Sequence, residues 1–231
     1  MTIFIKNHCD IAHEAMMQVR PELAEKFSNL IKFLSKYPAA ASALRGKQAP
    51  EIGSAEYIRR QAHTFANART PRAPLPPSTI PDSMVSVILE TYFNIPKYQL
   101  PRVQKEHLLS MGAENLVGDL LERYIASILE PSGWIWCSGA MIKAVDFVHP
   151  PENKEGEWLL LQIKNRDNSE NSSSSAIRGG TNIKKWFRTF SRKSGSNWDK
   201  FPCNKTKSQL SEDGFVEFSR HYLTSIRITS G

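Results

Sequence analysis

Cysteine is scarce in this chain and is not arranged in pairs. The three cysteines, Cys9, Cys137 and Cys203, lie far apart and form no CxxC motif. Their number and spacing argue against a disulfide framework, a zinc ribbon and a thioredoxin-like site. We therefore expect three reduced thiols without a catalytic task.

Long apolar runs are also missing. No segment approaches the roughly 18–20 apolar residues that a membrane helix needs, and the first residues reach a charge at Lys6 without the apolar core of a secretory signal. These two absences predict a soluble, cytoplasmic protein with no membrane partner.

Several catalytic signatures are absent as well. The six histidines form no HxH, HExxH or HNH-like group, and the chain has neither a P-loop nor a dinucleotide fingerprint. No repeat of 20–50 residues is present, which disfavours solenoids and propellers. With 231 residues of ordinary globular composition, the chain can form one large domain or a core with an accessory region.

Positive charge is present and is concentrated in one segment. The formal net charge is +7, and residues 178–207 contain nine basic side chains against one acid, Asp199. This segment is therefore +8 and the remainder is close to neutral. Concentrated positive charge suits a polyphosphate partner, because each neutralised phosphate releases counterions. The alternative is a solvated face that serves only solubility.

The first hundred residues have helical patterns. Apolar residues recur at helical spacing from Ile11 to Tyr37, and Pro21 is expected to open a second helix there. A further helix is predicted from Ser54 to Arg69, with Ser54 as its N-cap, and a short one from Asp82 or Ser83 to about Phe93. Prolines between Thr70 and Pro81 indicate an extended connection. We predict a helical region over residues 1–111, serving as scaffold or dimerisation surface.

The pattern changes after Gly112. A strong amphipathic helix is predicted from Glu114 to Glu130. Strands are expected at residues 134–137, 141–148 and 157–166, followed by a polar loop and a helix at about residues 175–191. Residues 112–231 are thus predicted to form a mixed α/β core, with a mixed central sheet flanked by helices.

Polar side chains interrupt two of these strands. Alternation places Gln162 and Lys164 on one face near the end of a buried strand. Burying a lysine without a partner is costly, so an acid or a phosphate is expected nearby. Asp146 lies among apolar residues of the preceding strand and can reach them if the two strands pair as a hairpin. The helix before them offers Asp119 and Glu122.

This arrangement resembles the core of the PD-(D/E)xK nucleases, with Glu122, Asp146 and Gln162-Ile163-Lys164 as the matching residues. Val145 replaces the family's proline, and Gln162 replaces its acid, so metal binding must depend more on Asp146 and a helix acid. Residues 162–169, the serine run and Lys184-Lys185-Trp186-Phe187-Arg188 resemble small type II restriction endonucleases of the SinI-like group. The resemblance covers about residues 114–202.

The resemblance implies a restriction-endonuclease-like fold and Mg²⁺-dependent cleavage of double-stranded DNA, at GGWCC-like sites if the SinI likeness holds. Asp146, Gln162 and Glu122 would hold Mg²⁺, with Asp119 as the alternative to Glu122, and Lys164 would orient the attacking water. A homodimer and a cognate DNA methyltransferase, as a genetic partner, are also implied. The residues expected to contact DNA are basic or amide side chains: Arg166, Asn168, Arg178, Lys184, Lys185 and Arg188.

Simpler interpretations remain open. Asp146 and Lys164 could be a structural ion pair, Glu122 a solvated helix acid, and the serine run a flexible loop. At the level of function, the alternatives are a nuclease of the same fold acting in repair, recombination or transposition, and a basic DNA-binding protein without catalysis.

Overall fold

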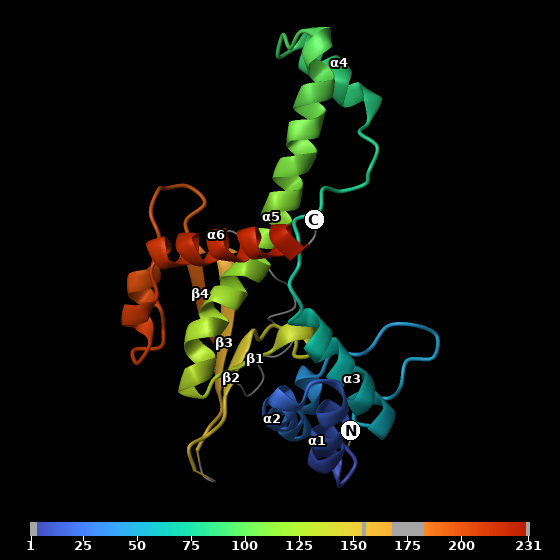
Figure 1. The fold of residues 1–231 in the computed structure, drawn as a ribbon, viewed down its shortest axis with the longest axis vertical. Coiled ribbons are helices and arrows are strands. Elements are labelled where there is room, and N and C mark those ends of the chain that lie inside the picture. Colours follow the sequence, from blue (N-terminus) through green and yellow to red (C-terminus); the bar gives the residue numbers. More distant parts are fainter. Residues whose placement is uncertain (1–3, 154–155, 168–182, 230–231) are drawn as a thin grey trace.

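The computed structural model describes residues 4–153, 156–167 and 183–229 and has a four-stranded mixed sheet at its centre (Figure 1). The strands are β1 (Ile135–Trp136), β2 (Phe147–His149), β3 (Leu159–Arg166) and β4 (Ile183–Thr189). Their order is β1-β2-β3-β4; the first two pairings are antiparallel and β3 pairs with β4 in parallel. The predicted mixed sheet with a helical N-terminal region is confirmed.

Six α-helices accompany the sheet in the described residues. They are α1 (His8–Val19), α2 (Ala24–Lys36), α3 (Ala55–Ala68), α4 (Ser83–Thr91), α5 (Leu100–Leu129) and α6 (Glu212–Thr229). None of these helices is both long and apolar enough to span a membrane.

The predicted N-terminal helix starts are confirmed, each for a local reason. Pro21 opens a 3-10 turn directly before α2, where its missing N–H leaves no helical hydrogen bond unmade. Ser54 caps α3 by accepting a hydrogen bond from the Tyr57 amide at 3.2 Å. Asp82 caps α4 in the same way, accepting from the Met84 amide at 2.9 Å.

Two apolar clusters lie on opposite faces of the sheet. One joins α1, α2 and α3 to Val148 and Leu160, and the other joins α5 and α6 to Leu161 and Trp186. Leu160 and Leu161 are neighbours on β3, so the alternation of a strand sends them to the two faces. The sheet is therefore buried on both sides, which explains the continuous apolar start of β3.

Several contacts cross between the N-terminal helices and the rest of the chain. The predicted boundary between residues 111 and 112 falls inside α5, and the first cluster combines N-terminal helices with residues of β1, β2 and β3. Glu130, just after α5, forms ion pairs with Lys26 at 2.7 Å and Arg69 at 2.8 Å. The division into two regions stays a prediction.

Three expected elements differ from the structure. The helix predicted from Glu114 to Glu130 begins earlier, because α5 starts at Leu100. The helix predicted at about residues 175–191 is wrong for its described part, because residues 183–189 form β4. Trp186 and Phe187 fit either element in the sequence, and pairing with β3 decides between them. The strand expected over residues 141–148 is confined to β2, because Ala144 has a φ of +57° and turns the chain before Asp146.

Candidate active site

Asp146 lies where the chain enters β2 and is held on three sides. Its amide donates to the Leu161 carbonyl at 2.9 Å, and its carbonyl accepts from the Cys137 amide at 2.8 Å. Its carboxylate oxygen Oδ2 accepts from the Ile163 amide at 2.6 Å. The hairpin pairing expected for Asp146 is thus confirmed, and the carboxylate is fixed against the middle of β3.

Gln162 and Lys164 follow on β3 from this point. Phe147 pairs with Leu161, so continuing the antiparallel register by one residue sets Asp146 opposite Gln162. On the other side Gln162 pairs with Lys185, and Lys164 pairs with Phe187. Gln162 is buried and Lys164 is partly exposed. The sheet therefore carries an acid, an amide and two lysines in adjacent positions.

Glu122 reaches the same region from α5. Its Oε2 accepts a hydrogen bond from Trp136 Nε1 at 2.8 Å, which ties the helix acid to β1. Its side chain interacts electrostatically with both Asp146 and Lys164. The helix acid and the two strand residues that the sequence suggested are thus brought together.

The two acids have strongly perturbed proton affinities. The pKa of Glu122 is raised to about 7, first by desolvation and then by the nearby charge of Asp146, whereas the Trp136 hydrogen bond and Lys164 act to lower it. Desolvation also raises the pKa of Asp146 to about 6, against the Ile163 hydrogen bond and Lys164. Both residues remain partly accessible. Perturbed acids that share one place are typical of functional sites.

Asp119, the other helix acid considered, has a different environment. Its Oδ2 accepts from Arg123 Nε at 2.7 Å. The Arg123 guanidinium also donates to the carbonyl oxygens of residues 68, 69 and 70, and so holds the end of α3. A carboxylate committed to this ion pair is less suited to a metal ion than Glu122.

The donor set of this site suits a hard cation. Among the described residues, no group of three or more His, Cys, Asp or Glu side chains is placed to hold a metal ion. Two carboxylates and the Gln162 carboxamide supply oxygen atoms only, which is the chemistry that Mg²⁺ prefers. The negative charges of Glu122 and Asp146 also repel each other, and a divalent cation would relieve that repulsion.

The expected DNA-contacting residues are divided between several locations. Lys185 lies beside Gln162, and Arg166 is exposed at the end of β3. Arg188 forms an ion pair with Glu212 of α6 and donates from Nε to Asn165 Oδ1 at 3.0 Å. Asn168 and Arg178 lie outside the described residues.

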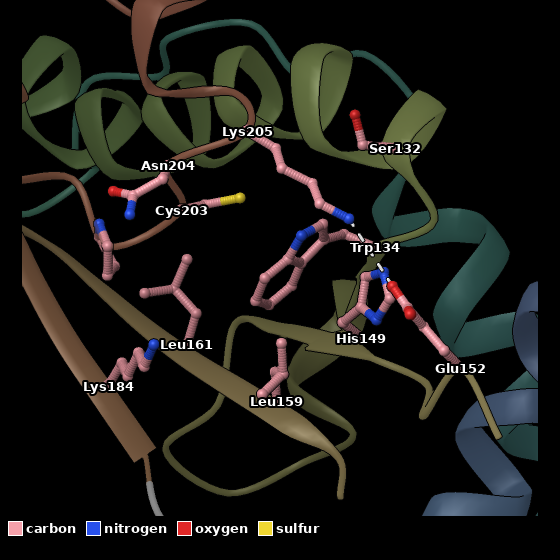
Figure 2. Close-up of a pocket in the computed structure, with 11 residues that line it drawn as sticks. Ser132, Trp134, His149, Glu152, Leu159, Leu161, Lys184, Cys203, Asn204 and Lys205 are labelled. Carbon is pink, nitrogen blue, oxygen red and sulfur yellow. Dashed lines mark ion pairs between the residues drawn. The ribbon is translucent and has the colours of Figure 1, made fainter. Parts of the chain in front are cut away.

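Lys184 faces a pocket on the other side of the sheet, next to Leu161 (Figure 2). The pocket has a volume of about 210 Å³ and is also lined by Trp134 and Cys203. At its mouth Lys205 Nζ and Glu152 Oε1 form an exposed ion pair at 3.7 Å (Figure 2). Because neighbouring residues of a strand point to opposite faces, Lys184 is separated from the Asp146 site while Lys185 is not.

Trp136 is a site residue that the sequence did not suggest. Its indole N–H holds Glu122, and its ring lies under the guanidinium groups of Arg69 and Arg123, at 5.1 and 5.2 Å from its centre. The signal available was a tryptophan on a short strand before the Asp146 strand. Its partner on α5 depends on tertiary packing, which local sequence patterns do not encode.

Comparisons with known proteins identify the family of this chain. The chain is 53% identical over 226 residues to the type II restriction enzyme Eco47I of Escherichia coli, covering 97% of this chain and 98% of that protein. It is 52% identical over 225 residues to the type II restriction enzyme SinI of Salmonella infantis, covering 97% of each. The family model of the SinI restriction endonucleases matches residues 8–225. The chain therefore belongs to the SinI restriction endonuclease family.

Proposed function

We propose that this chain is a type II restriction endonuclease that cuts both strands of DNA at a short specific sequence and depends on Mg²⁺. The observation that carries the metal dependence is the juxtaposition of Asp146 and Glu122, two desolvated acids with raised pKa values beside Lys164. Such a pair is unfavourable without a cation and supplies the ligands for one.

Asp146, the Gln162 side-chain oxygen and Glu122 would hold the ion in this proposal. When bound, Mg²⁺ lowers the pKa of its water and offsets negative charge that grows on the phosphate. The Ile163 amide fixes Asp146 Oδ2 at 2.6 Å, which leaves the other carboxylate oxygen for a ligand. Gln162 adds an oxygen without adding charge, so binding depends on the two acids.

Lys164 has the second role. Its ammonium group interacts electrostatically with both acids. We propose that it orients the attacking water and stabilises the negative charge of the scissile phosphate. Lys185, beside Gln162 in the parallel pairing, and Arg166 would contact neighbouring phosphates. The roles of Asn168, Arg178, Lys184 and Arg188 in DNA binding remain predictions.

Cutting both strands at one sequence needs two such sites related by a two-fold axis, and we therefore propose a homodimer. A GGWCC-like recognition sequence is proposed from the likeness to SinI. A cytoplasmic location and a cognate methyltransferase that protects the host's own sites complete the proposal.

The proposal is tested by incubating the purified protein with long DNA of mixed sequence, in Mg²⁺ and in EDTA. We expect discrete fragments in Mg²⁺ only, and sequencing of their ends gives the recognition sequence. A smear in Mg²⁺ would favour a same-fold nuclease without sequence specificity. Intact DNA in both reactions, with retarded migration at low salt, would favour a binding protein without catalysis.

A further inference from the structure

A helical arm projects from the body of the molecule (Figure 1). We define the α4 arm as residues 75–111, which include α4 and the first part of α5. The two helices lie against each other at the tip, where Gln104 Nε2 donates to Ser86 Oγ at 2.7 Å. At the base, Gly112 lets the backbone of Leu75 and Pro76 approach α5 so closely that an added Cβ would lie 2.9 Å from the Pro76 nitrogen.

The surface of the α4 arm is unusually apolar. Of the fourteen large apolar side chains that are exposed in the described residues, ten lie between Leu75 and Leu109. Along α4 and its C-cap residue, Met84, Ile88 and Tyr92 recur every four residues and form one stripe. Ser86, which binds α5, lies on the opposite face of the helix. The stripe therefore points away from the rest of the arm.

No other part of the described structure packs over the stripe on α4. The described residues bury no side chain of α4, although isolated helices of this length are only marginally stable in water. The arm exposes three aromatic rings and seven aliphatic side chains. Each ring buries roughly 150–250 Å² when covered, so the ten side chains together offer on the order of 1,000 Å² of apolar surface for burial. A stable interface takes about 800 Å² from each partner, and the arm as a whole exposes apolar surface of that order.

Charge indicates which partner fits. The arm is neutral because its charged side chains cancel: Asp82, Glu90 and Glu106 against Lys97, Arg102 and Lys105. The net charge of +7 is concentrated in residues 178–207, so this basic segment repels its equivalent in a second copy and attracts DNA. The neutral, apolar arm does neither. It offers phosphate groups no counterion release, whereas two such surfaces can meet without repulsion.

We infer that the α4 arm is the surface through which two copies of this chain associate, with the stripe of Met84, Ile88 and Tyr92 buried at the contact. The inference rests on the proposed function for its two-fold arrangement, because double-strand cleavage needs two Asp146 sites. It places the association on the arm and leaves the basic residues near Asp146 open to DNA.

The test uses sedimentation velocity of the full chain over a range of concentrations. We expect a dimer for the unmodified protein and, for Ile88→Glu, a dissociation constant raised at least roughly 30-fold, as for a central interface residue. Ile228→Glu is the matched control, because Ile228 is also an exposed helical isoleucine, on α6, and it should leave the dimer unchanged. A monomeric unmodified protein, or equal dimerisation of Ile88→Glu, would overturn the inference.

Hydrogen exchange of the α4 amides gives a second readout, together with Tyr92→Ser, which removes the ring without adding charge. We expect protection of α4 in the dimer and its loss in both variants, with the amides of α1 and α2 protected as in the unmodified protein. Two outcomes would contradict the inference. Protection of α4 in a monomer would mean that another part of the chain packs against the stripe, and protection only after DNA is added would mean that DNA does.

The two proposals fail separately. A monomer that still gives discrete Mg²⁺-dependent fragments overturns the association through the arm and leaves the proposed function intact. A dimer that Ile88→Glu dissociates, but that cuts no DNA, overturns the proposed function and leaves the arm as the interface.

Discussion

Replacing Glu122 by glutamine should make the metal-free protein more stable while it removes activity. The rise in the pKa of Glu122 from an ordinary 4.5 to about 7 means that the folded protein binds a proton more tightly than the unfolded chain. Stability from this group is therefore complete below about pH 4.5 and is lost as the pH rises through about 7.

The magnitude follows from the same values. At about 1.4 kcal/mol per pKa unit, charged Glu122 costs at most about 3 kcal/mol at pH 8. Because the side chain is partly accessible, we expect roughly 1–3 kcal/mol after allowance for solvent screening. Glutamine removes this cost, and its side-chain oxygen can still accept the Trp136 hydrogen bond.

The assay is urea unfolding in EDTA at pH 8 and at pH 4.5, at one fixed protein concentration. Glu122→Gln should be more stable than the unmodified protein at pH 8, and the gap should close at pH 4.5. Glu114→Gln, on an exposed part of the same helix, should differ by less than about 0.5 kcal/mol. Added Mg²⁺ should stabilise the unmodified protein more than the variant. Equal or lower stability of Glu122→Gln in EDTA at pH 8 would mean that charged Glu122 does not destabilise the folded protein.

Three further changes test the fold and the DNA surface. Arg69→Ala should lower the free energy of unfolding, measured by urea titration, by roughly 3–5 kcal/mol, because it breaks a largely buried ion pair with Glu130. Arg102→Ala, which breaks an exposed ion pair, should lower it by less than about 1 kcal/mol in the same titration. Gly139→Ala should cost roughly 1–3 kcal/mol, since its φ of +81° and the 2.9 Å approach to Thr64 exclude a Cβ. Lys185→Ala should weaken DNA binding equally for all sequences and reduce the slope of log affinity against log salt by about 1; an unchanged slope would remove Lys185 from the phosphate contacts.

Local patterns predicted the N-terminal helices and the hairpin well, because their determinants lie within a few residues. The Ser54 and Asp82 caps and the Pro21 start all follow from short-range hydrogen bonding. Alternation placed Gln162 and Lys164 on one face of their strand, and the structure shows the hairpin pairing that Asp146 needed to lie beside them.

Elements decided by tertiary contacts were not predicted. Lys184 to Arg188 formed a strand instead of a helix because β3 offers a parallel edge, and the sequence does not reveal that edge. The early start of α5 at Leu100 has the same origin, because α4 packs along its first turns. The hydrogen bond from Trp136 to Glu122 also joins elements whose contact depends on the whole fold.

The most direct test of the account is cleavage of mixed-sequence DNA by the Asp146→Asn variant in Mg²⁺. Asparagine can still accept the Ile163 hydrogen bond but brings no charge, so we predict DNA binding within a few-fold of normal and cleavage reduced at least about 100-fold. Asp199→Asn, at an exposed position, should give the same fragments as the unmodified protein. Fragments from Asp146→Asn at the normal rate would contradict the assignment of this site as the catalytic centre.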